Sequence, residues 1–136
     1  AVKACRASTR KKREPPSKES QMQDCLFCRI VRGEIPAAKV YEDDEVLAFN
    51  DIQPQRPVHV LVIPKKHITS LAHAGVEDTP VLGRMLAVAN QIAVDQGSTD
   101  GFRSIINTGR VGGQEVMHVH MHIVGGQEPV GPMLKR

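Results

Sequence analysis

The segment from Met117 to Val124 reads Met-His-Val-His-Met-His-Ile-Val and places three of the chain's six histidines at alternate positions. Successive side chains of an extended strand point to opposite faces of a sheet. The pattern therefore predicts a strand with His118, His120 and His122 on one face and apolar residues in the core. Three imidazoles so close together are costly to keep cationic. At least one should be neutral near pH 7 and available as a base, a nucleophile or a metal ligand.

A loop with several glycines precedes this strand. Residues 107–115 read Asn-Thr-Gly-Arg-Val-Gly-Gly-Gln-Glu, which offers close backbone approach, backbone N–H donors and side-chain amides for an oxyanion. The residues alone leave two chemistries open: a metal cluster of three histidines, or a histidine that attacks phosphorus covalently while its neighbours orient it. The loop favours the second, because phosphate is a natural ligand for it. A merely polar edge-strand face is the weakest interpretation, since titratable groups clustered beside a loop favour a site.

The charge is unevenly distributed along the 136 residues, a length that suits one domain. Residues 1–21 hold seven Lys and Arg against two acidic residues, include a Pro-Pro pair and show no apolar periodicity. We therefore expect a disordered basic extension over residues 1–22 and a folded domain over residues 23–136. The rest of the chain has 11 basic and 13 acidic residues, which makes nucleic acid an unlikely partner.

The sequence contains no apolar run near the length of about 18 residues that spans a bilayer, and no secretory signal. Its three cysteines do not make a disulfide framework. These features predict a reduced, cytoplasmic protein without a membrane partner.

Local patterns predict an α+β domain with an antiparallel sheet of about five strands, one long helix and one short helix. Asp24 should cap the short helix, and Asp78 or Thr79 should cap the long one, which should end before Gly97. The expected short helix covers residues 25–32, and the expected strands cover residues 40–42, 46–49, 59–63, 102–107 and 118–124. His73 is expected at the surface.

Two further groups of residues have more than one interpretation. Asp51 follows a predicted strand, where it could cap a turn or bind sugar hydroxyls. Cys25 and Cys28 form a Cys-x2-Cys pair, which suits a redox motif, small core residues or a metal site. The redox motif is disfavoured because the chain lacks a thioredoxin-like βαβ context.

The segment from His118 to Val124 matches the signature His-φ-His-φ-His-φ-φ, with φ apolar, of the histidine triad (HIT) family. The resemblance extends over almost the whole predicted domain, from Cys25-Leu26-Phe27-Cys28 to the Gly-Pro-Met-Leu that begins at Gly131. The end of the chain, from Gly125-Gly126 to Leu134, resembles most the proteobacterial Hint branch of the family. The resemblance implies a HIT-like fold and a homodimer in which two sheets join into one.

The resemblance also implies a purine nucleoside phosphoramidase, which hydrolyses the P–N bond of AMP or GMP phosphoramidates. His120 would attack phosphorus to give a nucleotidyl-histidine, His122 would contact the phosphate, and His59 and Gln114 would complete the catalytic set. Hydrolysing members carry His where His122 stands, so water would be the final acceptor. The purine nucleoside monophosphate or phosphoramidate would be bound by Leu26, Phe27, Ile30, Phe49, Asn50, Asp51, Ile52, Asn107, Gly113, Glu115 and Val116.

Many HIT proteins with the cysteine pair bind a structural Zn²⁺, and the resemblance implies that Cys25, Cys28, His67 and His118 hold it here. The alternative is that the reduced thiols simply pack. Three other functions stay open: a dinucleotide polyphosphate hydrolase of the same family, a nucleotide-binding regulatory protein with little turnover, and a hydrolase with a catalytic metal on all three histidines.

Overall fold

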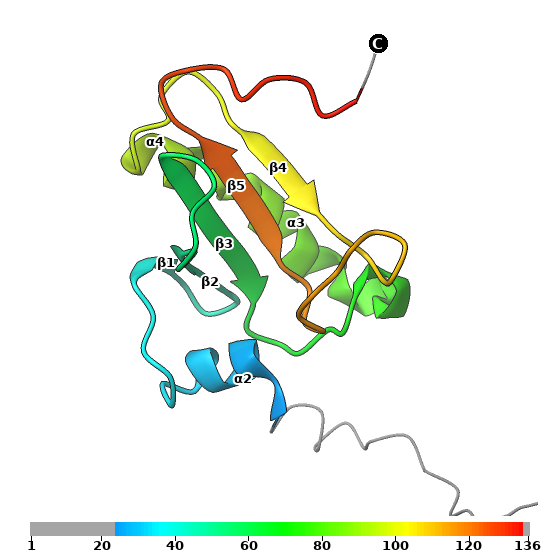
Figure 1. Ribbon diagram of the computed structural model, residues 1–136. Helices are drawn as coiled ribbons and strands as arrows, with labels where there is room; N and C mark the ends of the chain where they lie inside the picture. The colour runs from blue at the N-terminus through cyan, green and yellow to red at the C-terminus, as the bar shows by residue number, and fades with distance from the viewer. Residues whose placement is uncertain (1–23, 135–136) are drawn as a thin grey trace, which may run out of the picture.

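A five-stranded antiparallel sheet forms the centre of the computed structural model, which describes residues 24–134 (Figure 1). The strand order is β1-β2-β3-β5-β4, and the antiparallel sheet of five strands confirms the predicted fold class. The expected extension over residues 1–22 lies outside the described residues. The strands are β1 (Lys39–Glu42), β2 (Val46–Asn50), β3 (Val58–Pro64), β4 (Arg103–Ile106) and β5 (Met121–Gly125).

Helices cover the two faces of the sheet unequally. The back face carries α3 (Thr79–Ala87) and α4 (Ala89–Asp95), which pack on β2, β3 and β5 (Figure 1). Two 3₁₀ turns, η1 (Leu71–His73) and η2 (Val76–Asp78), lead into α3. Of the described helices, only the short α2 (Leu26–Val31) lies on the front face, beside β2 and β3. None of the described helices covers the front of β4 and β5.

The central strand β3 separates two hydrophobic clusters, and all seven of its residues are buried. Val58, Val60 and Val62 point to the back cluster with α3 and α4, whereas Leu61 and Ile63 point to the front cluster with α2. A strand covered on both faces reads as a continuous apolar run. This double burial explains why the sequence of β3 shows no alternation.

The predicted long helix is two helices separated at Val88, where ψ is −5°. The N–H of Val88 still donates to the Arg84 carbonyl, and that of Ile92 donates to the Val88 carbonyl. The apolar stripe therefore runs across the break, and a pattern of apolar residues cannot reveal it. Asp78 stands at the N-cap position but does not cap the helix. Its carboxylate instead accepts from the Gly75 N–H and pairs with Lys66.

Two other boundaries differ from the expectation. Cys25, not Asp24, is the N-cap of α2, and its sulfur accepts from the Cys28 N–H at 3.4 Å. Strand β5 begins at Met121 rather than at His118. The Val119 N–H donates to the Ile68 carbonyl at 2.7 Å, which draws this segment off the sheet ladder. Val119 is nevertheless buried in the core with Met121 and Ile123, as the alternation predicts.

Candidate functional site

A cavity of about 690 Å³ lies on the front face between α2, the sheet and the loop before β5. It brings together all eleven residues predicted to bind the nucleotide, along with two of the predicted catalytic histidines, His120 and His122. His59 lies behind His122, and Gln114 does not line the cavity. Sequence reasoning missed six lining residues: Ile35, Pro36, Ala37, Ala38, Gln53 and Leu61.

Strand register explains one of the missed residues. Leu61 pairs with Phe49 on one side and with His122 on the other, so all three side chains share the front face. A pairing diagram of the predicted strands could have found it. Ile35–Ala38 belongs to the irregular connection between α2 and β1, which carries no periodic signal.

The two ends of the cavity differ in chemistry. One end is formed by Phe49 and by Ile52, which is 94% exposed. The ring of Phe27 lies edge-on to both Phe49 and His120, with ring centroids 5.6 Å and 5.2 Å away. At the other end lie His120, His122 and Asn107. The cavity can therefore take a molecule with a flat apolar group at one end and an anion at the other.

The hydrogen bonds of His120 fix its tautomer. Its Nδ1 lies 2.8 Å from the His118 carbonyl oxygen, which can only accept a hydrogen bond. The proton of the neutral ring is therefore on Nδ1, and Nε2 keeps its lone pair. An imidazole in this state can act as a nucleophile.

A chain of two hydrogen bonds gives His122 the opposite tautomer. The Gln55 N–H donates to Nδ1 of His59 at 3.0 Å, so the His59 proton is on Nε2. That proton is donated to Nδ1 of His122 at 2.9 Å. His122 therefore carries its own proton on Nε2, from which it can donate to a phosphate oxygen. Burial, helped by the neighbouring His120 and His59, lowers the pKa of His122 and keeps it neutral.

Asp51 caps a turn and also lines the cavity. Its Oδ1 accepts from the Gln53 N–H at 2.8 Å, which caps the turn after β2. Its Oδ2 lies 3.4 Å from Nε2 of His59, and the residue lines the cavity.

Gln114 braces the glycine-containing loop instead of facing the cavity. Its Oε1 accepts from the Gly109 N–H at 2.9 Å, and its Nε2 donates to the carbonyls of Thr69 and Val116. Both N–H donors of this buried amide are therefore used, and its oxygen accepts one hydrogen bond. These bonds hold the side chain of Gln114 against the main chain, and its membership of the catalytic set stays a prediction. Neighbouring Gly113, with φ at 78°, adopts the left-handed conformation that glycine favours.

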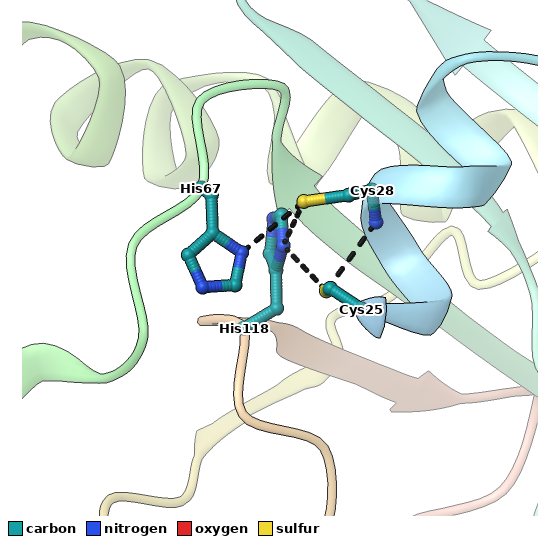
Figure 2. Close-up of side chains that lie close together, drawn as sticks. All are labelled: Cys25, Cys28, His67 and His118. Atoms are coloured by element: carbon teal, nitrogen blue, oxygen red, sulfur yellow. Dashed lines mark hydrogen bonds between the residues drawn. The ribbon is translucent and has the colours of Figure 1, made fainter. Parts of the chain in front are cut away.

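A second cluster lies at the N-terminus of α2 and contains the four predicted metal ligands (Figure 2). Nδ1 of His118 lies 3.3 Å from the Cys25 sulfur and 3.6 Å from the Cys28 sulfur. Nδ1 of His67 lies 3.1 Å from the Cys28 sulfur. Four donors about 2.0–2.3 Å from a tetrahedral zinc ion are about 3–4 Å from one another. The spacing of the cluster therefore fits zinc.

The surroundings of these ligands fit a metal as well. Nε2 of His118 donates to the Pro64 carbonyl at 2.8 Å, which leaves the lone pair on the Nδ1 that faces the sulfurs. Burial lowers the pKa of His118 to about 4 and also lowers that of His67, so both rings are neutral. Burial and the neighbouring Cys25 raise the pKa of the Cys28 thiol to about 12. A bound cation would reverse this effect by stabilising the thiolate.

Two structural links join the cluster to the cavity. The carbonyl of His118 holds the His120 ring, while the imidazole of His118 faces the cysteines. Phe27 lies between the two cysteines in sequence, and its ring packs edge-on against both His118 and His120. A change in the cluster therefore acts on the groups that line the cavity.

His73 is exposed and bonds only to Ser70 among the described residues, as its expected surface position requires. Within residues 24–134, no helix is both long and apolar enough to cross a membrane.

Comparisons with known proteins place this site in a family. The model of the HIT domain matches residues 32–129. Protein HitA of Neisseria gonorrhoeae is 54% identical over 104 residues, which cover 76% of this chain and 97% of the relative. The purine nucleoside phosphoramidase of Escherichia coli is 50% identical over 113 residues, covering 82% of this chain and 94% of the relative.

Solved structures agree with the sequence matches. A histidine triad protein from Clostridium difficile superposes with a TM-score of 0.75 at 48% identity, covering 80% of this chain and 96% of the other. A HIT family hydrolase from Legionella pneumophila gives 0.73 at 46% identity, with 77% and 95% covered. With its domain match, its sequence relatives and its fold, the chain belongs to the HIT domain family.

Proposed function

We propose that this protein is a nucleotide hydrolase that cleaves the P–N bond of purine nucleoside phosphoramidates through a nucleotidyl-His120 intermediate. The observation that carries the proposal is the pair of opposite tautomers at the polar end of the cavity. His120 offers a lone pair on Nε2, and His122 offers an N–H on Nε2. The name of the Escherichia coli relative supports the same reaction.

In this mechanism the purine occupies the apolar end, between α2 and Ile52, and Asp51 binds the ribose. The phosphate then lies beside the histidines, Asn107 and the loop at Gly113, with Glu115 and Val116 at its edge. A nucleotide placed this way presents phosphorus to Nε2 of His120. The fixed orientation of the ring lowers the entropic cost of reaching the transition state.

The reaction has two displacements at phosphorus. Nε2 of His120 forms a bond to phosphorus while the P–N bond breaks, and the amine takes one proton from solvent and departs. Water then attacks phosphorus and breaks the bond to His120, which releases the nucleoside monophosphate and returns one proton to solvent. In both steps the Nε2–H of His122 donates to a phosphate oxygen and stabilises the developing charge.

We further propose that Cys25, Cys28, His67 and His118 hold a structural Zn²⁺, which the spacing and softness of the four donors support. Bound zinc would tie α2 to the loops that carry the two histidines. His118 then orients His120 through its carbonyl. The free thiols suit a reducing compartment, so we propose the cytoplasm as the location.

A homodimer joined at a sheet edge is also part of the proposal. Strand β4 ends one side of the sheet and pairs only with β5 among the described strands. Pairing of two such edges would make one continuous sheet.

Trapping of the intermediate tests the mechanism. Wild-type protein mixed with an adenosine phosphoramidate should show, by mass spectrometry after an acid-free quench, a transient mass increase of one adenylyl group. His120→Ala should show neither adduct nor turnover. Full turnover by His120→Ala would exclude the nucleophile, and tight purine-nucleotide binding without turnover by the wild type would favour a regulatory binding protein.

A panel of substrates distinguishes a phosphoramidase from a dinucleotide polyphosphate hydrolase of the same family. Phosphoramidates should be hydrolysed with a higher kcat/KM than dinucleoside polyphosphates. The reverse order would assign the protein to dinucleotide polyphosphate hydrolysis.

A further inference from the structure

Cys25 and Cys28 are placed to bond to each other as well as to hold a metal (Figure 2). The Cys28 N–H donates to the Cys25 sulfur at 3.4 Å, so this sulfur is turned toward Cys28. Both are free cysteines, and their sulfurs lie within 4.8 Å of each other. Because an S–S bond is about 2.05 Å long, the two sulfurs need to approach by at most about 3 Å to form a disulfide.

The two sulfurs differ in their exposure to solvent. Cys28 is buried, whereas Cys25 is only partly buried and has exposed residues on both sides in the sequence, Asp24 and Leu26. Exposure is one of the conditions that select which cysteines of a protein are oxidised. A small oxidant can therefore reach Cys25 from solvent, and Cys28 lies ready beside it.

A disulfide would also change the metal-binding capacity of the cluster. Cysteine binds a metal as the thiolate, so the disulfide would remove two of the four proposed zinc ligands. His67 and His118 would be the only donors left, whereas a structural zinc ion requires four. Loss of the metal therefore rests on the zinc site proposed above, but formation of the disulfide does not.

The loop after β3 gives a third link between the cluster and the cavity. It carries His67, and the next two residues bond to the two segments that border the cavity. The Ile68 carbonyl accepts from the Val119 N–H in the histidine row at 2.7 Å. The Thr69 carbonyl accepts from Nε2 of Gln114, in the glycine-containing loop, also at 2.7 Å. Release of His67 from a metal would therefore loosen the supports of both segments.

We propose that Cys25 and Cys28 are a site of reversible oxidation by hydroperoxides, and that their disulfide lowers the affinity of the cavity for nucleotide. The pair would regulate its own protein and would need no thioredoxin-like fold around it. Disulfides in a reducing compartment are mostly transient and redox-sensing, which agrees with the proposed location. The ring of Phe27, between the two cysteines in sequence, also contacts His120 and would respond to the new bond.

The oxidation has two steps. One oxygen of hydrogen peroxide bonds to the Cys25 sulfur while the O–O bond breaks, which gives a sulfenic acid and water. The Cys28 sulfur then bonds to the Cys25 sulfur, and the sulfenic oxygen leaves as a second water with the proton of the Cys28 thiol. The pair has then lost two electrons and two protons to the peroxide, and a dithiol can return them.

Mass spectrometry tests the oxidation site. Cys5→Ser provides the protein, because it leaves Cys25 and Cys28 as the only cysteines. A small excess of hydrogen peroxide should lower the mass of the peptide that holds both cysteines by two hydrogens, and dithiothreitol should restore it. Thiols that stay free, or that gain oxygen irreversibly, would overturn the proposal.

Two measurements on the same protein test the consequences. A chromogenic zinc indicator should show metal released in step with disulfide formation. Calorimetry should show that AMP binds at least about fivefold more weakly after oxidation, and dithiothreitol with zinc should restore the affinity. An unchanged AMP affinity in the fully oxidised protein would overturn the proposed effect on the cavity.

Other outcomes separate this inference from the proposed function. A reduced protein without zinc would contradict the zinc site, and a lower AMP affinity after oxidation would then support an effect through Phe27. A reduced protein that does not bind AMP would contradict the nucleotide site, while the mass of the peptide would still decide the disulfide.

A variant without thiols controls for oxidation of methionine. Cys25→Ser with Cys28→Ser, in the Cys5→Ser background, should keep its own AMP affinity when peroxide is added. A fall as large as in the parent would assign the effect to methionine and overturn the proposal. If thermal unfolding shows that this variant is not folded, recovery of the parent decides, because dithiothreitol restores a disulfide, whereas methionine sulfoxide requires its own reductases.

Discussion

Two clusters that contain histidines differ in which ring nitrogens remain available to bind a metal. Cys25, Cys28, His67 and His118 form one, and Asp51, His59 and His122 form the other, with the ligand atoms of each cluster within 4.8 Å of one another. In the first cluster, hydrogen bonds to protein oxygens use the Nε2 side of both rings and direct Nδ1 toward the sulfurs. In the second, His59 accepts at Nδ1 and donates at Nε2.

This difference decides what each cluster can do. The first keeps lone pairs that converge on one point, as a metal site requires. In the second, a metal on His59 would have to displace the proton that it donates to His122 or break its bond to Gln55. The second cluster is thus arranged to orient protons, which argues against a catalytic metal held by the histidine row. Both clusters contain histidines. What distinguishes the metal site from the proton-orienting site is whether one ring nitrogen of each histidine is left without a hydrogen bond to a protein nitrogen or oxygen.

Removal of one sulfur should give the largest effect on stability. Cys28→Ser is expected to lose stoichiometric zinc and at least about 3 kcal/mol of unfolding free energy, because a tightly bound metal stabilises the folded state by mass action. Metal analysis and denaturant unfolding measure both quantities. A chelator should destabilise the wild type and leave the stability of Cys28→Ser unchanged. If the wild type is purified without metal and added zinc does not stabilise it, the thiols only pack against their neighbours and bind no metal.

Acid should destabilise the metal-free protein in a defined pH range. Burial lowers the pKa of His118 from 6.5 to about 4, so the unfolded state binds the proton more tightly. The resulting contribution is fully present above pH 6.5 and is lost as the pH falls through about 4, about 3 kcal/mol in all. Urea unfolding of chelator-treated protein between pH 7.5 and 4 measures it. His118→Gln should flatten most of this dependence, and an unchanged slope in that variant would assign the titration elsewhere.

Sequence predicted the arrangement of the sheet better than the state of its histidines. The apolar runs and turn residues sufficed for five strands, because β2, β3 and β5 are mostly buried and the edge strands β1 and β4 pack partly buried apolar side chains against the core. The alternation from His118 to His122 also placed Val119, Met121 and Ile123 in the core. It did not reveal where β5 begins, because the competing partner of the Val119 N–H is the carbonyl of Ile68, which is distant in sequence.

The candidate site shows the same limit. Residue types and family resemblance identified most of the residues that line the first cavity. They did not reveal the tautomers, which depend on the backbone N–H of Gln55 and the backbone carbonyl of His118. Every backbone carries such groups, so no side-chain pattern marks them. The sequence likewise did not reveal the hydrogen-bond partners of Gln114, which are the main chain of Gly109, Thr69 and Val116.

Replacement of His59 tests the proton-orienting role of the second cluster. His59→Phe keeps a ring of similar size but removes the donor that fixes His122, so kcat should fall about 100-fold. Metal content should not change, because the first cluster does not contact His59. His73→Phe, a matched change at an exposed histidine, should leave kcat within about twofold. Loss of metal together with activity in His59→Phe would show that the two clusters are not separate.

Asp51→Asn should have the smallest effect and should appear in KM. The amide oxygen can still accept from the Gln53 N–H, so the turn is retained, while the charge that would bind the ribose hydroxyls is removed. We expect KM for an adenosine phosphoramidate to rise about tenfold, equivalent to about 1.4 kcal/mol. A 2′,3′-dideoxy substrate, which lacks those hydroxyls, should bind wild type and variant equally. If kcat fell instead and the dideoxy substrate were affected as strongly, Asp51 would act through His59, 3.4 Å away, and would belong with the proton-orienting residues.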